Sequence, residues 1–246
     1  MLYLIGLGLN ENGISIEGKE ALKSCKKIYL EGYTVDFPYS IEMLEKSLGK
    51  KLEMLERAHV ESDKIINEAK KENVALLVYG SPLFATTHLS LLMDAKKNKI
   101  GAKVIYAASV FDALAETGIQ LYKLGKITSM PAWKKNFTPD SFMDIVGENQ
   151  SIKAHSLILV DIGLGILDAL HQLKVSARNK KIKLGKIIIC TRLGTKESKI
   201  YYDTLENLMI KAEDEDESQE IEPPFCLIMP SELHFIEKES VESWLT

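Results

Sequence analysis

Cysteine and long apolar runs are both scarce in this sequence. Its 246 residues include three cysteines, Cys25, Cys190 and Cys226, and no two of them form a Cys-x-x-Cys pair. A disulfide framework and a zinc site are therefore not expected, and each thiol is interpreted as a small buried hydrophobe. No apolar stretch approaches the ~18 residues of a membrane span, and the first residues, MLYLIGLGLN, lack the basic leader of a signal peptide. We therefore expect a cytoplasmic protein that does not enter a membrane.

Positive charge is not in excess either. The chain carries 31 basic and 35 acidic residues, which gives a formal net charge of −4 and a sequence pI near 5.8. A protein that grips nucleic acid usually presents a broad basic face. Direct nucleic-acid binding is therefore not expected. The acidic run EDEDE, residues 213–217, is interpreted as a solvated loop without a function.

Several signatures of catalysis and cofactor binding are missing. Gly6 and Gly8 could begin a dinucleotide fingerprint, but Glu11 stands where the third glycine is needed. The P-loop lysine pattern is absent, no serine lies in a nucleophile elbow, and the histidines show no metal-ligand spacing. The sequence therefore predicts no nicotinamide, flavin or metal site, and it assigns no catalytic residue.

Strand and helix patterns alternate over the first part of the chain. Apolar runs typical of strands occur at 1–7, 26–34, 74–79 and 101–109. Stretches of helical period lie between them, at 15–25, 39–48, 63–73 and 89–99. Strand, helix and strand at this spacing predict βαβ units with parallel strands and right-handed crossovers.

The pattern changes after residue 109. Residues 110–125 predict a helix of about four turns. Three strand-like runs follow, SLILVDIG, KIIICTRLG and FCLIMPS, with helical patterns between the first two and after the second. The sequence therefore predicts two α/β domains, residues 1–110 and 111–246.

One loop stands out among the connections. The segment GSPLFATTHLSLL, residues 80–92, follows the apolar run VALLVY directly. Open α/β sheets bind ligands at the carboxyl ends of their strands, and this loop begins at such an end. Gly80 permits close backbone approach, Pro82 stiffens the loop, and Thr86 or Thr87 can cap the next helix. A ligand-binding loop and an ordinary strand-to-helix turn are both consistent with these residues.

Motifs along nearly the whole chain resemble the diphthine synthase family of methyltransferases. They are YLIGLGLNENGISIEGKEALKSCKKIYLEGYT, YGSPLFATTHLSLL, TGIQLYKLGK, LVDI and PPFCLIMPSELH, in order and at matching spacing from residue 1 to about 238. The resemblance implies a tetrapyrrole methylase-like (class III methyltransferase) architecture of two α/β domains with mixed sheets. It also implies that S-adenosylmethionine binds in the cleft between the domains, and that the chain forms a homodimer.

The resemblance also implies which residues contact the cofactor. The family's positions correspond to Leu9, Ser81, Phe84, Ser109, Val110, Val160, Leu193 and Phe225. Two positions depart from the family. Its loop usually reads Gly-Asp-Pro where Ser81 gives Gly-Ser-Pro here, and histidine is common where this chain has Phe225. A hydroxyl thus replaces a carboxylate beside the cofactor.

The implied reaction is a methyl transfer in diphthamide biosynthesis. Members of the family methylate the α-amino nitrogen of a 3-amino-3-carboxypropyl group on a histidine of translation elongation factor 2, giving diphthine and S-adenosylhomocysteine. Two alternatives remain open: a methylase of the same fold that acts on a tetrapyrrole or on ribosomal RNA, and a cofactor-binding protein without catalysis. The tetrapyrrole enzymes typically carry Gly-Pro-Gly-Asp after the first strand, where this chain has GLGLNENG.

Overall fold

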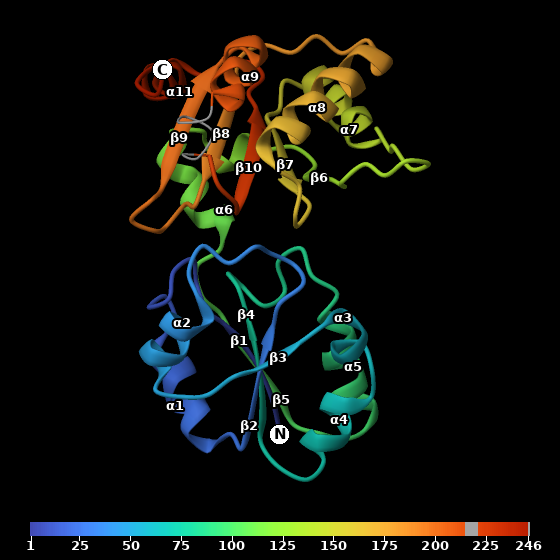
Figure 1. The fold of residues 1–246 in the computed structure, drawn as a ribbon, viewed down its shortest axis with the longest axis vertical. Coiled ribbons are helices and arrows are strands. Elements are labelled where there is room, and N and C mark those ends of the chain that lie inside the picture. Colours follow the sequence, from blue (N-terminus) through green and yellow to red (C-terminus); the bar gives the residue numbers. More distant parts are fainter. Residues whose placement is uncertain (215–220, 246) are drawn as a thin grey trace. The chain divides into compact units, whose positions relative to one another are not determined.

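The computed structural model describes residues 1–214 and 221–245 and divides into two compact units (Figure 1). The first unit is Met1–Asp112 and the second is Ala113–Thr246. Each unit contains one five-stranded sheet. The acidic run at 213–217 lies mostly outside the described residues, so its interpretation as a loop is untested.

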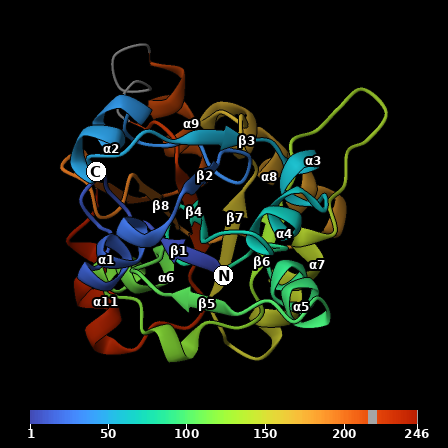
Figure 2. The ribbon, with the colours of Figure 1, turned by 90° about the horizontal axis from the view of Figure 1, so that it is seen from below.

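The first sheet has the order β3-β2-β4-β1-β5, and every neighbouring pair is parallel. Figure 2 shows this order, with α1 and α2 on one face of the sheet and α4 and α5 on the other. The elements are β1 (Leu2–Gly6), α1 (Ile16–Ser24), β2 (Lys27–Glu31), α2 (Ile41–Leu48), β3 (Glu53–Leu55), α3 (Arg57–Val60), α4 (Lys64–Ala69), β4 (Val74–Val78), α5 (Leu89–Lys97), β5 (Ala102–Ile105) and α6 (Val110–Ala113).

Local sequence explains the regularity of this unit. The sheet is covered on both faces, so its central strand β4 is apolar and fully buried throughout. The side chains of Ser15 and Ser40 accept the amide hydrogens of Gly18 and Met43 and thereby cap the first turns of α1 and α2. The predicted βαβ pattern and parallel pairing are confirmed here.

The second sheet has the order β6-β7-β10-β8-β9. Strands β6 and β7 are parallel, and the other neighbours are antiparallel. The expected mixed pairing is therefore found in this sheet, whereas the first sheet is parallel throughout. The elements are η1 (Leu114–Thr117), η2 (Leu121–Lys123), β6 (Thr128–Met130), α7 (Phe142–Ser151), β7 (Ser156–Val160), α8 (Ile166–Lys180), β8 (Ile187–Thr191), β9 (Lys199–Asp203), α9 (Leu205–Glu213), β10 (Phe225–Met229) and α11 (Phe235–Glu242).

The prediction of a four-turn helix over 110–125 is wrong. The structure has only the short helix α6 and two 3-10 turns in that range. Gly118 adopts a left-handed conformation with φ of 85°, and the Thr117 hydroxyl accepts the amide hydrogen of Ile119, so the helical bonding stops there. Leu114 and Ile119 are both buried, and the backbone turns between them.

The cysteines and the helix lengths can also be compared with the sequence predictions. Cys25, Cys190 and Cys226 are all buried free thiols, as predicted. Within residues 1–214 and 221–245, every helix is too short or too polar to span a lipid bilayer.

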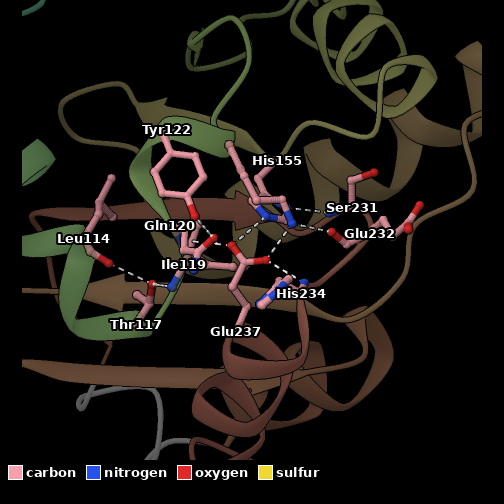
Figure 3. A network of polar contacts seen from close by, with 11 residues as sticks. Leu114, Thr117, Ile119, Gln120, Tyr122, His155, Ser231, Glu232, His234 and Glu237 are labelled. Carbon is pink, nitrogen blue, oxygen red and sulfur yellow. Dashed lines mark hydrogen bonds and ion pairs between the residues drawn. The ribbon is translucent and has the colours of Figure 1, made fainter.

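A buried polar network joins remote parts of the second unit. Figure 3 shows His155, which precedes β7, and Glu237, on α11, pointing toward one another. Their Nε2 and Oε1 atoms are 3.1 Å apart, and both side chains are fully buried. Glu237 also accepts from the Lys123 ammonium at 2.6 Å and from the amides of Gln120 and His234 at 2.9 and 2.7 Å. The Glu237 carboxylate thus connects α11 both to the segment 120–123 and to the start of β7.

The protonation states of this network follow from its hydrogen bonds. The Nδ1 atom of His155 accepts the amide hydrogen of Ser231 at 2.9 Å, so the proton of the neutral ring is on Nε2 and is donated to Glu237. Burial lowers the pKa of His155, against the opposing effect of Glu237. Burial by itself raises the pKa of Glu237, but the bonds from Lys123 and from the two amides outweigh it and lower that pKa to about 2.

We expect Glu237→Gln to destabilise the second unit by about 3 kcal/mol at pH 7, because breaking a buried, hydrogen-bonded ion pair leaves its partners unpaired. The pKa of Glu237 is depressed in the fold, so its contribution is complete above pH 4.5 and disappears as the pH falls to about 2. The difference in stability between parent and variant should therefore shrink over that range. Urea unfolding followed by tryptophan fluorescence reports on this unit, because Trp133 and Trp244 both lie in it.

Glu232→Gln is the matched control. The Glu232 carboxylate also binds a lysine, Lys153, at 2.6 Å, but both side chains are exposed. Its loss should change the stability by no more than about 1 kcal/mol. A Glu237 variant no less stable than the control would contradict a structural role for the network.

Candidate functional site

The cofactor positions predicted in the first unit gather at one edge of its sheet. Strands β4, β1 and β5 are adjacent and parallel, so their carboxyl ends lie at the same edge. Leu9 follows β1, Ser81 and Phe84 follow β4, and Ser109 and Val110 follow β5. Residues that are up to about a hundred positions apart in sequence are thereby brought to neighbouring loops, at the edge where open α/β sheets bind ligands.

Two glycines join the first two of these loops. Gly8 and Gly80 form a backbone bridge, with the Gly80 amide donating to the Gly8 carbonyl at 2.9 Å and the Gly8 amide donating back at 3.3 Å. Both residues have positive φ angles, 73° and 68°. A side chain at Gly8 would also place its Cβ 2.8 Å from the carbonyl oxygen of Gly13. The glycine turn is therefore required by the close approach of backbones.

Further hydrogen bonds support the loops after β1 and β5. The Leu9 carbonyl accepts from the Tyr79 hydroxyl at 3.1 Å. The Ser109 amide and hydroxyl both donate to the Asp112 carboxylate, at 2.6 and 3.0 Å, which fixes the start of α6 at Val110. These loops are thus held by hydrogen bonds on both sides of β1.

The loop after β4 combines a free hydroxyl with an aromatic pair. The Ser81 hydroxyl makes no hydrogen bond within the described part of the chain, and the Ser81 carbonyl accepts from the Phe84 amide at 3.2 Å. The Phe84 ring packs against Phe111, with centroids 5.1 Å apart. The prediction that Thr86 or Thr87 caps the next helix is wrong. His88 is the N-cap residue of α5, and the Thr86 hydroxyl donates to the Pro82 carbonyl instead.

The three positions predicted in the second unit also share one edge. Val160 ends β7, Phe225 begins β10, and Leu193 lies just after β8. Strand β10 runs antiparallel between β7 and β8, with Phe225 opposite Thr191, so its start lies beside the ends of both neighbours. Leu193 and Phe225 are nearly buried, which gives this edge an apolar character.

The polar network around Glu237 lies at the opposite edge of that sheet. His155 precedes β7 and Ser231 follows β10, and these are the ends remote from Val160 and Phe225. The network therefore supports the unit without contributing to the candidate edge.

A polar cluster that was not predicted from the sequence lies at the edge of the first sheet. Tyr33 follows β2, Arg57 follows β3, and His88 closes the loop after β4. The Tyr33 hydroxyl lies 3.4 Å from His88 Nε2, and the Arg57 guanidinium lies 5.2 Å from the centroid of the Tyr33 ring. Burial raises the pKa of Tyr33 to about 12, so its hydroxyl is protonated at neutral pH. The sequence placed Tyr33 inside the predicted strand 26–34, whereas β2 ends at Glu31 and Tyr33 lies in the turn that follows.

The edge of the first sheet offers backbone groups, an aromatic pair and single polar side chains, and the edge of the second sheet is apolar at Leu193 and Phe225. Among the described residues, no group of three or more His, Cys, Asp or Glu side chains could hold a metal ion. Among the described residues at these edges, the Ser109 hydroxyl donates to the Asp112 carboxylate, but the same carboxylate oxygen also accepts the Ser109 amide hydrogen, as in a helix cap. The geometry therefore suits binding and orientation of a ligand better than covalent catalysis by the protein.

The fold is an α/β architecture of two units, each with one five-stranded sheet whose strand ends carry the predicted cofactor positions. The chain matches the family model of Tetrapyrrole (Corrin/Porphyrin) Methylases over residues 1–209. Diphthine synthase of Methanothermobacter thermautotrophicus is 35% identical over 253 residues, which cover 97% of this chain and 93% of that protein. Diphthine methyl ester synthase of Candida glabrata is 46% identical over 166 residues, and the match spans 66% of this chain and 56% of that protein.

Solved structures agree with the sequence relatives. A crystal structure of a diphthine synthase has a TM-score of 0.86 and 29% identity, with 99% of this chain and 95% of that chain covered. A crystal structure of a protein from Entamoeba histolytica has a TM-score of 0.88 and 30% identity, with 100% and 98% covered. The chain therefore belongs to the tetrapyrrole methylase family and, within it, to the diphthine synthase group. The predicted resemblance is confirmed.

We expect Gly8→Ala to destabilise the first unit well beyond the ordinary cost of a left-handed alanine, which is about 1 kcal/mol. The added Cβ would collide with the backbone of Gly13, and relieving such an overlap costs on the order of 1–3 kcal/mol more. Gly163→Ala is the matched control, because Gly163 has a similar φ of 75° and open space around its Cβ position. Urea unfolding followed by circular dichroism compares the two variants, and equal losses would show that the glycine turn is not tight.

Proposed function

We propose that the chain binds S-adenosylmethionine and methylates the α-amino nitrogen of a 3-amino-3-carboxypropyl group on a histidine of translation elongation factor 2. The observation that carries this proposal is the near full-length likeness to diphthine synthases. The proposed partner is a cytosolic translation factor, so the chain is placed in the cytoplasm. We also propose that the chain acts as a homodimer, as the family resemblance implies.

The candidate edges fit the proposed cofactor. Phe84 and Phe111 form an aromatic pair against which a flat base can pack, and the Ser81 hydroxyl has its hydrogen-bonding capacity unused among the described residues. The left-handed turn at Gly80 leaves no side chain between the backbone and a ligand. We assign cofactor contacts to Leu9, Ser81, Phe84, Ser109 and Val110 in the first unit, and to Val160, Leu193 and Phe225 in the second.

The proposed mechanism needs no activated nucleophile on the protein. An α-amino group has a pKa of about 7.7–8.0, so a useful fraction is neutral and nucleophilic at cellular pH. When bound, S-adenosylmethionine supplies a methyl group on a sulfonium sulfur, which is a good leaving group. The residues of the two edges would hold the reacting groups in line and exclude water. This division of tasks explains why no catalytic residue is assigned in the chain.

A second candidate product is a methyl ester. The fungal relatives that match this chain at 42–46% identity are named diphthine methyl ester synthases, whereas the archaeal relatives at 33–35% are named diphthine synthases. We therefore propose as the alternative that this chain also methylates the carboxylate oxygen of the same group. The fungal match covers 56% of the Candida glabrata protein, so the likeness concerns one region of that relative.

The deciding experiment incubates the chain with S-adenosylmethionine and elongation factor 2 that carries the first-stage modification. We expect the mass of the peptide that carries the modified histidine to rise in steps of one methyl group, and mass spectrometry counts these steps. An ester methyl is removed by mild alkali and an N-methyl group is not, so the same sample separates the two products. Cofactor binding without any methylated peptide would favour the non-catalytic alternative, and methylation of ribosomal RNA or a tetrapyrrole instead would reject the proposed substrate.

We expect Ser81→Asp to bind S-adenosylmethionine as tightly as the parent or tighter, by on the order of 1 kcal/mol after the desolvation cost. A carboxylate attracts the cofactor's positive charges, and charge-assisted hydrogen bonds are roughly twice as strong as neutral ones. Isothermal titration of both chains measures the change. A tenfold loss of affinity at an unchanged melting temperature would show that the loop is built around the hydroxyl, so that an added charge lies unpaired.

A further inference from the structure

The edge of the first sheet has a second half that the proposed cofactor positions leave unused. Those positions follow β4, β1 and β5. Sheet order continues from β4 to β2 and β3, and the carboxyl ends of these strands lie at the same edge because all neighbours are parallel. Tyr33, Arg57 and His88 stand just beyond those three ends. The two halves share the loop after β4, which carries Ser81 in one half and His88 in the other.

Tyr33 is held rigidly in this half. The buried carboxylate of Glu31 accepts the Tyr33 amide hydrogen at 2.8 Å and the Thr34 hydroxyl at 2.6 Å, so the turn after β2 is fixed. The Tyr33 ring meets His88 edge to face, with centroids 6.5 Å apart and an interplanar angle of 82°. Because Glu31 uses both oxygens within the turn, its charge serves the fold and not a ligand.

His88 connects this half to the cofactor loop and fixes the Tyr33 hydroxyl. His88 is buried, and its Nδ1 lies 3.0 Å from the Pro82 carbonyl, which can only accept a hydrogen bond. Nδ1 therefore carries the ring proton, and Nε2 accepts from the Tyr33 hydroxyl at 3.4 Å. The tyrosine donates its single proton inward and has none to donate to a carboxylate outside. A ligand carboxylate at this place would depend on Arg57 for its donors.

Arg57 is a cation that is positioned but not neutralised. Its guanidinium packs over the Tyr33 ring at 5.2 Å, while 64% of its side chain is exposed. Its nearest carboxylate partner is Glu61 at 4.0 Å, and both side chains are solvated, so this pair is weak. The Arg57 guanidinium forms no hydrogen bond among the described residues, and its carbonyl accepts from the Glu61 amide. Its N–H donors are available, and the aromatic ring limits the directions they take.

We propose that Arg57, supported by Tyr33, binds the carboxylate of the acceptor's 3-amino-3-carboxypropyl group. The inference rests on the proposed function and names the part of the substrate that this half of the edge recognises. A guanidinium matches a carboxylate with two parallel N–H···O bonds, which fixes orientation as well as affinity. The acceptor carries its amino group and its carboxylate on the same carbon. Holding the carboxylate beyond β3 leaves the amino nitrogen next to it to face the half of the edge assigned to the cofactor.

Steady-state kinetics of methyl transfer to elongation factor 2 test this assignment. Arg57→Gln removes the charge, and we expect the KM for the factor to rise about tenfold or more, because hydrogen bonds to charged groups are the strong ones. Arg57→Lys keeps the charge without the two-pronged geometry and should fall between parent and Gln variant. Tyr33→Phe keeps the ring beneath the guanidinium and should change KM by less than threefold. The dissociation constant of S-adenosylhomocysteine, measured by isothermal titration, should stay within twofold in all three variants.

Arg178→Gln is the matched control, because Arg178 is an exposed arginine in the last turn of α8, in the second unit. A similar rise in KM for this control would attribute the effect to net charge and overturn the assignment. So would an Arg57→Gln variant whose KM stays within twofold of the parent, or one whose affinity for S-adenosylhomocysteine falls as far as its KM rises. A parent chain that methylates no elongation factor 2 would remove the proposed function and this inference together, whereas the other outcomes remove the inference alone.

Discussion

The candidate site depends on one backbone contact, the bridge between Gly8 and Gly80. Parallel pairing of β1 with β4 brings two strand ends together, and reciprocal backbone hydrogen bonds between Gly8 and Gly80 keep the chains that leave those ends side by side. Both glycines adopt left-handed angles, and a Cβ at Gly8 would collide with the backbone of Gly13. Every position assigned to the cofactor in the first unit follows one of three strands: β1 and β4, whose loops form this bridge, or β5, which is the other neighbour of β1.

In the second unit, the predicted cofactor positions share one sheet edge because of antiparallel and not parallel pairing. Its central strand β10 runs antiparallel to both neighbours, so residues at its start lie beside residues at their ends. Val160, Leu193 and Phe225 lie at that edge because Val160 ends β7, Phe225 begins β10 and Leu193 follows β8. At the opposite edge, the buried carboxylate of Glu237 accepts hydrogen bonds from the side chains of Lys123 and His155 and from two backbone amides. Stability and ligand binding are thus assigned to different ends of one sheet.

The proposed chemistry does not require a catalytic dyad at either edge. An amine that is partly neutral at cellular pH and a sulfonium leaving group need alignment more than activation. Under this proposal, specificity resides in recognition of the acceptor. The cation of Arg57, carried on an aromatic ring beyond β3, is a group suited to that task. The shared loop after β4 would then couple recognition to cofactor binding through the Pro82 carbonyl and His88.

The sequence by itself determined the strongly patterned elements and the family. The buried strand β4, the alternation of strands and helices before residue 110, and the loop that begins at Gly80 could be recognised because a strand covered on both faces is apolar throughout and a left-handed turn favours glycine. Tertiary structure decided what depends on remote partners. Strand β3 is a three-residue edge strand with two exposed positions, and β9 is an edge strand held by β8 and by a bridge from Tyr202 to Leu245, so neither has a clear local signal. The predicted helix after residue 110 ends early because Gly118 turns the backbone to bury Leu114 and Ile119. The cluster of Tyr33, Arg57 and His88 exists only because three parallel strands end at one edge, and the order of strands in a sheet is set by packing between segments that no local pattern records.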